Sequence, residues 1–104
     1  SDLMQALYGR NGESPVIVIA ASTPGNCFKY AYESAKLTLE HMTPVILLTD
    51  GYIANGSAPW KIQSADEMPD IDNRIVTEGD ENWHHYDRDT DTLARNWAIP
   101  GTSG

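Results

Sequence analysis

The apolar residues in the first part of the chain fall into runs with the periods of helices and strands. Residues 2–8 contain good helix formers with apolar side chains on one face and end at Gly9, which predicts a short helix. Residues 16–21 form a continuous, largely β-branched run, which is typical of a strand buried on both faces. A second apolar run at 45–49, followed by the turn dipeptide Asp50-Gly51, predicts another strand.

A stretch with helical period lies between these strands. Thr23 and Pro24 suit the N-cap and first position of a helix, with Asn26 as a competing cap, and Thr43-Pro44 ends it. One stripe is apolar and the opposite face is charged, at spacings that allow ion pairs between turns. The stripe is Phe28, Ala31, Tyr32, Ala35, Leu39 and Met42, and the charged face is Lys29, Glu33, Lys36 and Glu40. The pattern predicts an amphipathic helix whose apolar stripe covers a sheet.

Strand, helix and strand in this order make a βαβ unit with a right-handed crossover. Residues 21–22 and 49–50 then meet at the carboxyl edge of a parallel sheet, where open α/β folds bind ligands. Parallel sheets normally carry helices on both faces, but this unit leaves one face bare. We therefore expect an α/β fold with a partial three-layer parallel sheet that forms the end of a larger domain.

The second part of the chain lacks these periods. Residues 63–104 are rich in Asp, Asn, Thr, Gly and Pro, with a linker-like end at 100–104. Residues 90–97 predict one or two helical turns with Leu93 and Trp97 inward. Before this part, residues 51–60 suit an ordered loop anchored by aromatic side chains. We therefore divide the chain into an α/β part, 1–62, and a mostly irregular acidic segment, 63–104.

Charge divides the chain at the same place. Residues 1–62 hold four basic and five acidic side chains, whereas 63–104 hold three basic and ten acidic, so most of the formal net charge of -8 lies in the second part. An acidic chain without clustered cations argues against binding to nucleic acid or to a membrane surface. No run approaches the roughly 20 apolar residues of a membrane span. The single cysteine, Cys27, forms no internal disulfide, which favours a cytoplasmic location.

Three alternating aspartates after two adjacent histidines raise the question of a metal site. These residues are His84, His85, Asp87, Asp89 and Asp91. A calcium loop of the EF-hand type starting at Asp87 requires glycine and an acid where this chain has Thr92 and Ala98. Adjacent histidines also point in different directions in any regular element. We favour a solvated acidic loop and leave ion binding by the aspartates open.

Other single positions have a chemical and a structural interpretation. Cys27 lies near a helix N-terminus, which activates thiols, but it has no Cys-x-x-Cys partner, so a buried small side chain is favoured. The loop 21–26 is neither a dinucleotide nor a Walker loop, which favours a plain βα turn. Asp50 suits a catalytic carboxylate or a turn, and His41 suits the helix dipole. We assign no catalytic, cofactor-binding or metal-binding residue.

Five colinear segments carry a likeness to a known family. They are DLMQALYGRNGE, ASTP, CF, TPVILLTDGYIANG and ARNWAIPGT, at residues 2–13, 21–24, 27–28, 43–56 and 94–102. With these segments the chain resembles the α subunits of the 2-oxoacid:ferredoxin oxidoreductase family, and its 2-oxoglutarate branch is favoured. Residues 63–89 match least well.

The resemblance implies a complex, with thiamine diphosphate, Mg and iron–sulfur clusters, that oxidatively decarboxylates a 2-oxoacid. The acyl group passes to coenzyme A and the electrons to ferredoxin. It also implies that 1–62 are the C-terminal part of the pyrimidine-binding domain and that 63–104 lead toward the next domain. The family's Tyr-Pro-Ile-Thr-Pro-like and Gly-Gly-Pro-Ser-Thr-Gly-like motifs, which contact cofactor and substrate, do not occur in this chain. We therefore expect a structural segment without cofactors, inactive alone, that works with the other subunits of the complex.

A small stand-alone α/β binding or interaction module is the alternative, with its acidic part meeting a basic partner. An open reading frame that extends upstream through a Gly-Pro-Ser-Thr-Gly segment would exclude this alternative. In a fragment of a larger domain the bare sheet face predicts self-association or some disorder in solution, because exposed apolar surface tends to find cover.

Overall fold

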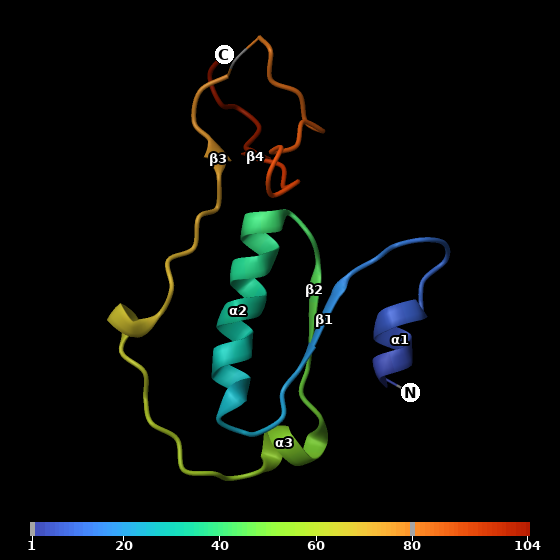
Figure 1. The fold of residues 1–104 in the computed structure, drawn as a ribbon, viewed down its shortest axis with the longest axis vertical. Helices are drawn as coiled ribbons and strands as arrows, with labels where there is room; N and C mark the ends of the chain where they lie inside the picture. Colours follow the sequence, from blue (N-terminus) through green and yellow to red (C-terminus); the bar gives the residue numbers. More distant parts are fainter. Residues whose placement is uncertain (1, 80) are drawn as a thin grey trace.

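A computed structural model describes residues 2–79 and 81–104 (Figure 1). Its elements are α1 (Asp2–Tyr8), β1 (Ile17–Ala20), α2 (Asn26–His41), β2 (Val45–Leu48), α3 (Gly51–Asn55), the 3-10 turn η1 (Ala65–Glu67), β3 (Ile75–Val76) and β4 (Trp97–Ala98). The order of helices and strands predicted for the first part is confirmed as far as β2. Both strands are slightly shorter than their apolar runs.

The predicted βαβ unit is present. β1 and β2 pair in parallel, with Ile17 opposite Val45 and Ala20 opposite Leu48. α2 connects the two strands and packs mainly against β2, while α1 stands on the other side of the strands (Figure 1). Within the described residues α1 makes little contact with either strand. The structure therefore supports an α/β fold with small parallel sheets, whereas the expected three-layer arrangement is not established.

The end of α1 is fixed by its neighbours in sequence. The Gly9 N–H donates to the Gln5 carbonyl at 2.8 Å, and a Cβ at Gly9 would lie 2.5 Å from that oxygen. The Arg10 guanidinium donates to the carbonyls of Ala6 and Leu7 at 2.6 and 2.7 Å. Because these carbonyls have no partners within the helix, the arginine caps the predicted C-terminus of α1.

α2 begins slightly later than its predicted cap. Gly25 occupies the N-cap position without a side-chain hydrogen bond, and Thr23 Oγ1 accepts from the Asn26 N–H at 3.3 Å. Met42, at φ 48°, ends the helix in the left-handed region. Lys36 and Glu40 form the expected ion pair one turn apart at 2.7 Å.

The predicted sheet-facing stripe of α2 is largely wrong. Phe28, Ala31, Ala35 and Leu39 are exposed, whereas Tyr30, Ser34, Leu37 and Thr38 are half-buried. The reason is that α2 is touched from two directions: it packs on the strands, and the later part of the chain runs along it. Apolar residues therefore lie on two faces of this helix. The stripe with the most regular spacing is not the face that packs on the sheet.

Contacts spaced along α2 hold the later part of the chain to it. Near the start of the helix, the rings of Phe28 and Trp60 lie 5.4 Å apart. The Tyr32 hydroxyl then donates to the Pro69 carbonyl. At the far end, the Trp97 indole N–H donates to the Leu39 carbonyl at 2.6 Å. The chain after α3 thus follows the helix from one end to the other, as Figure 1 shows.

Residues 63–104 are more regular than predicted. β3 and β4 pair in parallel, with Ile75 opposite Trp97. The Gly79 N–H extends this contact by donating to the Ser103 carbonyl at 2.7 Å. The helical turns expected at 90–97 are absent, since Leu93 has φ 59° and is exposed, while Trp97 is half-buried in β4.

Very little of the chain is fully buried. Ala6 and Ala94, at 8% and 3% exposure, are the buried apolar residues among those described, and the strand residues are mostly half-buried. None of the described helices has the length and apolar content of a membrane span. The described structure is therefore held together by main-chain pairing and partial packing rather than by a closed core.

Candidate functional site

The carboxyl ends of β1 and β2 lie at one edge of the sheet, as the sequence predicts. The Ala21 N–H donates to the Leu48 carbonyl at 3.0 Å and holds the two strand ends together. Beyond this edge β1 continues into α2, and β2 continues into α3. It is the place where open α/β sheets bind ligands, so it is the first candidate site.

The loop after β1 uses its polar groups internally. The Asn26 N–H donates to the Thr23 carbonyl at 3.1 Å, and the Cys27 N–H donates to the Pro24 carbonyl at 3.2 Å. The Asn26 side-chain amide donates to Ser22 Oγ at 3.0 Å. Because the first amides of α2 already have acceptors, the geometry favours a plain βα turn over a phosphate cradle.

Asp50 caps α3. Its carboxylate accepts from the Ile53 N–H at 2.7 Å, and its carbonyl accepts from the Ala54 N–H at 2.8 Å. This helix is missing from the sequence prediction, which gave an ordered loop there. An aspartate directly before a short apolar run was the signal for it. The structure supports the structural interpretation of Asp50.

Two shallow hollows open beside this edge. The first, of about 440 Å³, lies between the start of α2 and the loop after α3 and is lined in part by Cys27, Phe28 and Trp60. The second, of about 390 Å³, is lined in part by Tyr52 and Asn55. Gly56 belongs to both, and a Cβ at this position would lie 2.8 Å from the Tyr52 carbonyl oxygen. The tilted pair of Phe28 and Trp60 supports the predicted aromatic anchoring at Trp60, whereas Tyr52 is 86% exposed and does not anchor the segment.

Neither hollow carries a charged side chain in its lining. Cys27 is half-buried rather than buried as predicted, and its sulfur lies 3.8 Å from the Thr23 carbonyl oxygen. Acid–base chemistry requires a titratable pair within hydrogen-bond reach, and nucleophilic chemistry requires a base beside the nucleophile. The described residues at this edge provide neither arrangement.

The alternating aspartates serve a turn. The Asp89 carboxylate accepts from the Thr92 N–H at 2.8 Å and from the Asp91 N–H at 2.9 Å. These hydrogen bonds, first that of Thr92, lower the pKa of Asp89. The Asp87 carboxylate accepts from the His84 N–H at 3.0 Å. In the part of the chain that the structure describes, no three His, Cys, Asp or Glu side chains gather as a metal site would need.

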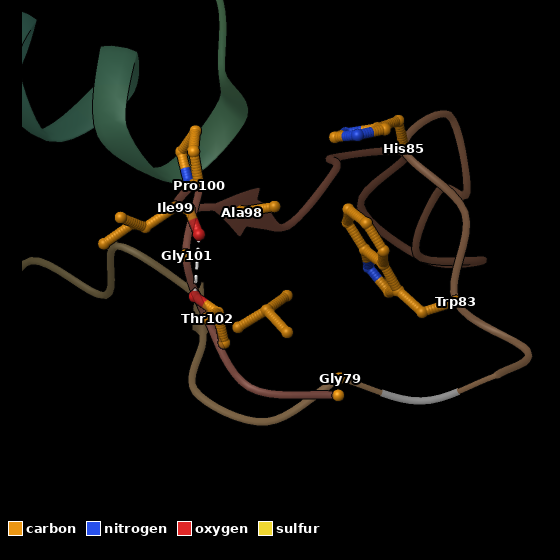
Figure 2. Close-up of a pocket in the computed structure, with 10 residues that line it drawn as sticks. Gly79, Trp83, His85, Ala98, Ile99, Pro100, Gly101 and Thr102 are labelled. Atoms are coloured by element: carbon orange, nitrogen blue, oxygen red, sulfur yellow. Dashed lines mark hydrogen bonds between the residues drawn. The ribbon is translucent and has the colours of Figure 1, made fainter.

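A third cavity, of about 300 Å³, lies beside β3 and β4 (Figure 2). Trp83 and His85, with ring centroids 4.8 Å apart, form one side of it, and Ala98 to Thr102 form the other. Gly79 and Gly104 touch at its rim, where a Cβ on Gly79 would lie 2.6 Å from the Gly104 carbonyl carbon. Sequence reasoning missed this cavity because its walls come from distant segments without a shared period.

Comparison with known proteins adds what geometry alone does not. Residues 1–100 match a protein-family model described as "Pyruvate flavodoxin/ferredoxin oxidoreductase, thiamine diP-bdg", that is, thiamine diphosphate-binding. This chain belongs to that family. The resemblance inferred from the five sequence segments is thereby confirmed.

Individual relatives are subunits of 2-oxoglutarate and 2-oxoacid oxidoreductases. The 2-oxoglutarate oxidoreductase subunit KorA of Mycobacterium tuberculosis (strain ATCC 25618 / H37Rv) is 52% identical over 100% of this chain. Subunit alpha of 2-oxoacid:ferredoxin oxidoreductase 1 from Sulfurisphaera tokodaii is 30% identical over 83% of it. The 2-oxoglutarate synthase subunit KorA of Archaeoglobus fulgidus is 33% identical over 52%. The chain spans 16%, 14% and 16% of these proteins' lengths, respectively. No solved structure matches it significantly.

Proposed function

We propose that this chain is an architectural segment of the α subunit of a 2-oxoacid:ferredoxin oxidoreductase, with 2-oxoglutarate as the substrate. The observation that carries the proposal is the 52% identity to a 2-oxoglutarate oxidoreductase subunit, which extends over both parts of the chain. The complete enzyme cleaves the bond between the carboxylate and the keto carbon, releases carbon dioxide and forms the thioester of coenzyme A. Two electrons leave through iron–sulfur clusters to oxidised ferredoxin.

We infer that the described residues of this chain do not by themselves complete a thiamine diphosphate site. The cofactor needs an acidic partner for its aminopyrimidine and cationic or metal neutralisation of its diphosphate. The hollows at the sheet edge offer neither, and the Asp50 carboxylate caps α3. We therefore assign cofactor contacts to other parts of the enzyme and derive no catalytic step from this chain.

The contribution of the chain is positional. β1, α2 and β2 provide a parallel unit with its carboxyl edge open, and such a unit holds loops at fixed places. We place the end of the pyrimidine-binding domain at residue 62. Residues 63–104 then serve as the connection toward the next domain, and their contacts along α2 support a connection held against the domain rather than a free linker.

The other subunits of the oxidoreductase are the partners that the proposal requires, and we place the complex in the cytoplasm. The name "subunit" in the relatives supports the first expectation. The absence of disulfide potential in a chain with a single cysteine supports the second.

A chimeric enzyme tests the proposal. In the M. tuberculosis subunit, the matching segment is replaced by this chain and the subunit is prepared in its complex. We expect reduction of a viologen dye that depends on both 2-oxoglutarate and coenzyme A, at a rate within about tenfold of the unaltered complex. An assembled chimera without this activity would contradict the proposal. The chain alone is expected to show no turnover, and turnover would refute its architectural role.

A further inference from the structure

Arg74 has an unusual main-chain conformation for a residue with a side chain. Its φ is 48°, in the left-handed region, directly before β3. This region is disfavoured for residues other than glycine, and such a conformation persists where the surrounding structure holds it. Both main-chain polar groups are in use here: the Arg74 N–H donates to Asp72 Oδ1 at 3.1 Å, and the Arg74 carbonyl accepts from the Trp97 N–H at 3.1 Å. The main chain of Arg74 therefore joins residue 72 to the start of β4.

The Arg74 side chain reaches a third segment, the acidic turn of residues 87–92. Its Nη1 donates to Thr92 Oγ1 at 3.1 Å, and its Nε lies 4.0 Å from Asp72 Oδ2. Thr92 Oγ1 in turn donates to Asp89 Oδ1 at 3.2 Å. The Arg74 side chain is 27% exposed, and its positive charge acts on the carboxylates of both Asp72 and Asp89. One guanidinium thus connects two segments that carry negative charge.

A second set of hydrogen bonds ties residue 72 to α2. The Asp72 N–H donates to Glu40 Oε1 at 3.2 Å. Both carboxylate oxygens of Glu40 also accept from Lys36 Nζ at 2.7 Å, and the Lys36 and Glu40 side chains are only 22% and 19% exposed. Hydrogen bonds to charged groups are stronger than neutral ones, and salt screens partly buried charges less than exposed ones. A path of polar contacts therefore runs from α2 through Asp72 and Arg74 to the acidic turn.

We propose that Arg74 is a positioning residue that holds the acidic turn and β4 to the end of α2. A positive side chain at this point also offsets the repulsion within residues 63–104, which carry ten acidic and three basic side chains. The inference rests on the proposed role of residues 63–104 as a held connection, and it names the residue on which the hold depends. Because these contacts are polar and lie outside the β1–β2 pair, their loss should release the acidic turn without opening β1, α2 and β2.

Hydrogen exchange of the chimeric complex, followed by mass spectrometry of its peptides, tests this role. Arg74→Asn places a residue that tolerates the left-handed region but is too short to reach Thr92. Exchange in residues 87–97 should become at least about tenfold faster, while that of β1 and β2 should change less than about threefold. The matched control is Arg95→Asn, which removes the same charge from a guanidinium 5.4 Å from the centre of the exposed Tyr86 ring. This control should change exchange in residues 87–97 less than about threefold.

Two further variants show whether the side chain acts through Thr92. In a Thr92→Val background, which lacks the hydroxyl, Arg74→Asn should accelerate exchange by less than about threefold, because both substitutions remove one shared contact. Arg74→Lys keeps a donor and the charge and should retain most of the protection. Unchanged exchange in Arg74→Asn overturns the proposal, as does an equal acceleration in Arg95→Asn or one that extends equally to β1 and β2. Failure of the proposed function appears separately, as missing dye reduction in the chimera without these substitutions.

Discussion

Residues 1–62 and residues 63–104 are organised by different kinds of interaction. In the first region, main-chain pairing of β1 with β2 and the packing of α2 on them set the structure. In the second, β3 and β4 pair over two residues, and side chains that bond to nearby backbone groups set the turns: Ser64 and Glu67 form a capping box, and the Asp89 carboxylate accepts from two amides of its turn. Among the described acidic residues of the second region, Glu67, Asp72, Asp87 and Asp89 accept hydrogen bonds from nearby backbone amides, so these four act as local caps.

The two regions also depend differently on one another. The first has its own parallel pair and a long helix, whereas the second has a short parallel pair and contacts that helix through Pro69, Asp72 and Trp97. α2 is therefore the shared element. The strongest test of the comparison is to remove the contact that the second region makes with the end of this helix.

Replacing Trp97 should have the largest effect. Trp97→Ala removes a half-buried indole and its bond to the Leu39 carbonyl, and we expect a loss of about 2 kcal/mol, less than the roughly 3–5 kcal/mol of a fully buried tryptophan. Urea unfolding at one fixed protein concentration measures it. Trp97→Phe keeps most of the ring and should cost about 1 kcal/mol. Equal losses in both variants would show that the hydrogen bond, and not the packing of the ring, accounts for the contribution of Trp97.

Substitutions at Asp50, in the first region, distinguish a structural role of this residue from a catalytic one. Asp50→Ala should lower the free energy of unfolding by about 1 kcal/mol, because the N-cap of α3 is lost, while Asp50→Asn keeps an acceptor and should cost only a few tenths. Both variants should leave the dye reduction of the chimeric complex unchanged. If Asp50→Asn abolishes that activity while stability is kept, Asp50 is a catalytic residue and its structural interpretation is wrong.

Asp89 gives the second region a weak dependence on acid. Its pKa is lower in the folded chain than in the unfolded one, so its stabilisation is complete above the unfolded value of about 4 and is lost as the pH falls through the folded value. Between pH 6 and pH 2, Asp89→Asn should therefore show a shallower decrease in stability than the unaltered chain. Asp91→Asn is the control. If stability falls with pH equally steeply in Asp89→Asn and in the unaltered chain, Asp89 does not contribute to the acid dependence.

Calcium should have no measurable effect. The carboxylates of Asp87 and Asp89 already accept backbone hydrogen bonds, and binding an ion would require the turn to open. Calorimetry should detect no heat of binding at millimolar calcium. A saturable heat that Asp87→Asn abolishes would restore the ion-binding interpretation of the acidic loop.

The sequence predicted those elements that have a period of their own. Runs of four or more apolar residues revealed β1 and β2, and the spacing of polar and apolar residues revealed α2. β3 and β4 are two residues long and show no period, and their pairing joins Ile75 to Trp97 across a long loop. The stripe of α2 failed because periodicity shows that a face is apolar but not which neighbour covers it.

The candidate site, too, could be predicted only as far as it depends on the periodic elements. Topology placed the two strand ends together, but it did not show that Asp50 caps a helix or that Trp83 and His85 border a cavity. Those outcomes depend on single hydrogen bonds and on contacts between distant segments. The family was recognised from long colinear segments, which carry more information than any single residue of the site.

The three tryptophans lie at three different contacts between segments of the molecule. The Trp60 ring is tilted against Phe28 at the start of α2, the Trp97 indole N–H donates to the Leu39 carbonyl near its end, and Trp83 lies beside His85 at the cavity. Variants that retain one indole each would thus give three separate fluorescence signals. Stopped-flow refolding with these signals would reveal whether the ends of α2 are engaged at the same moment or in sequence.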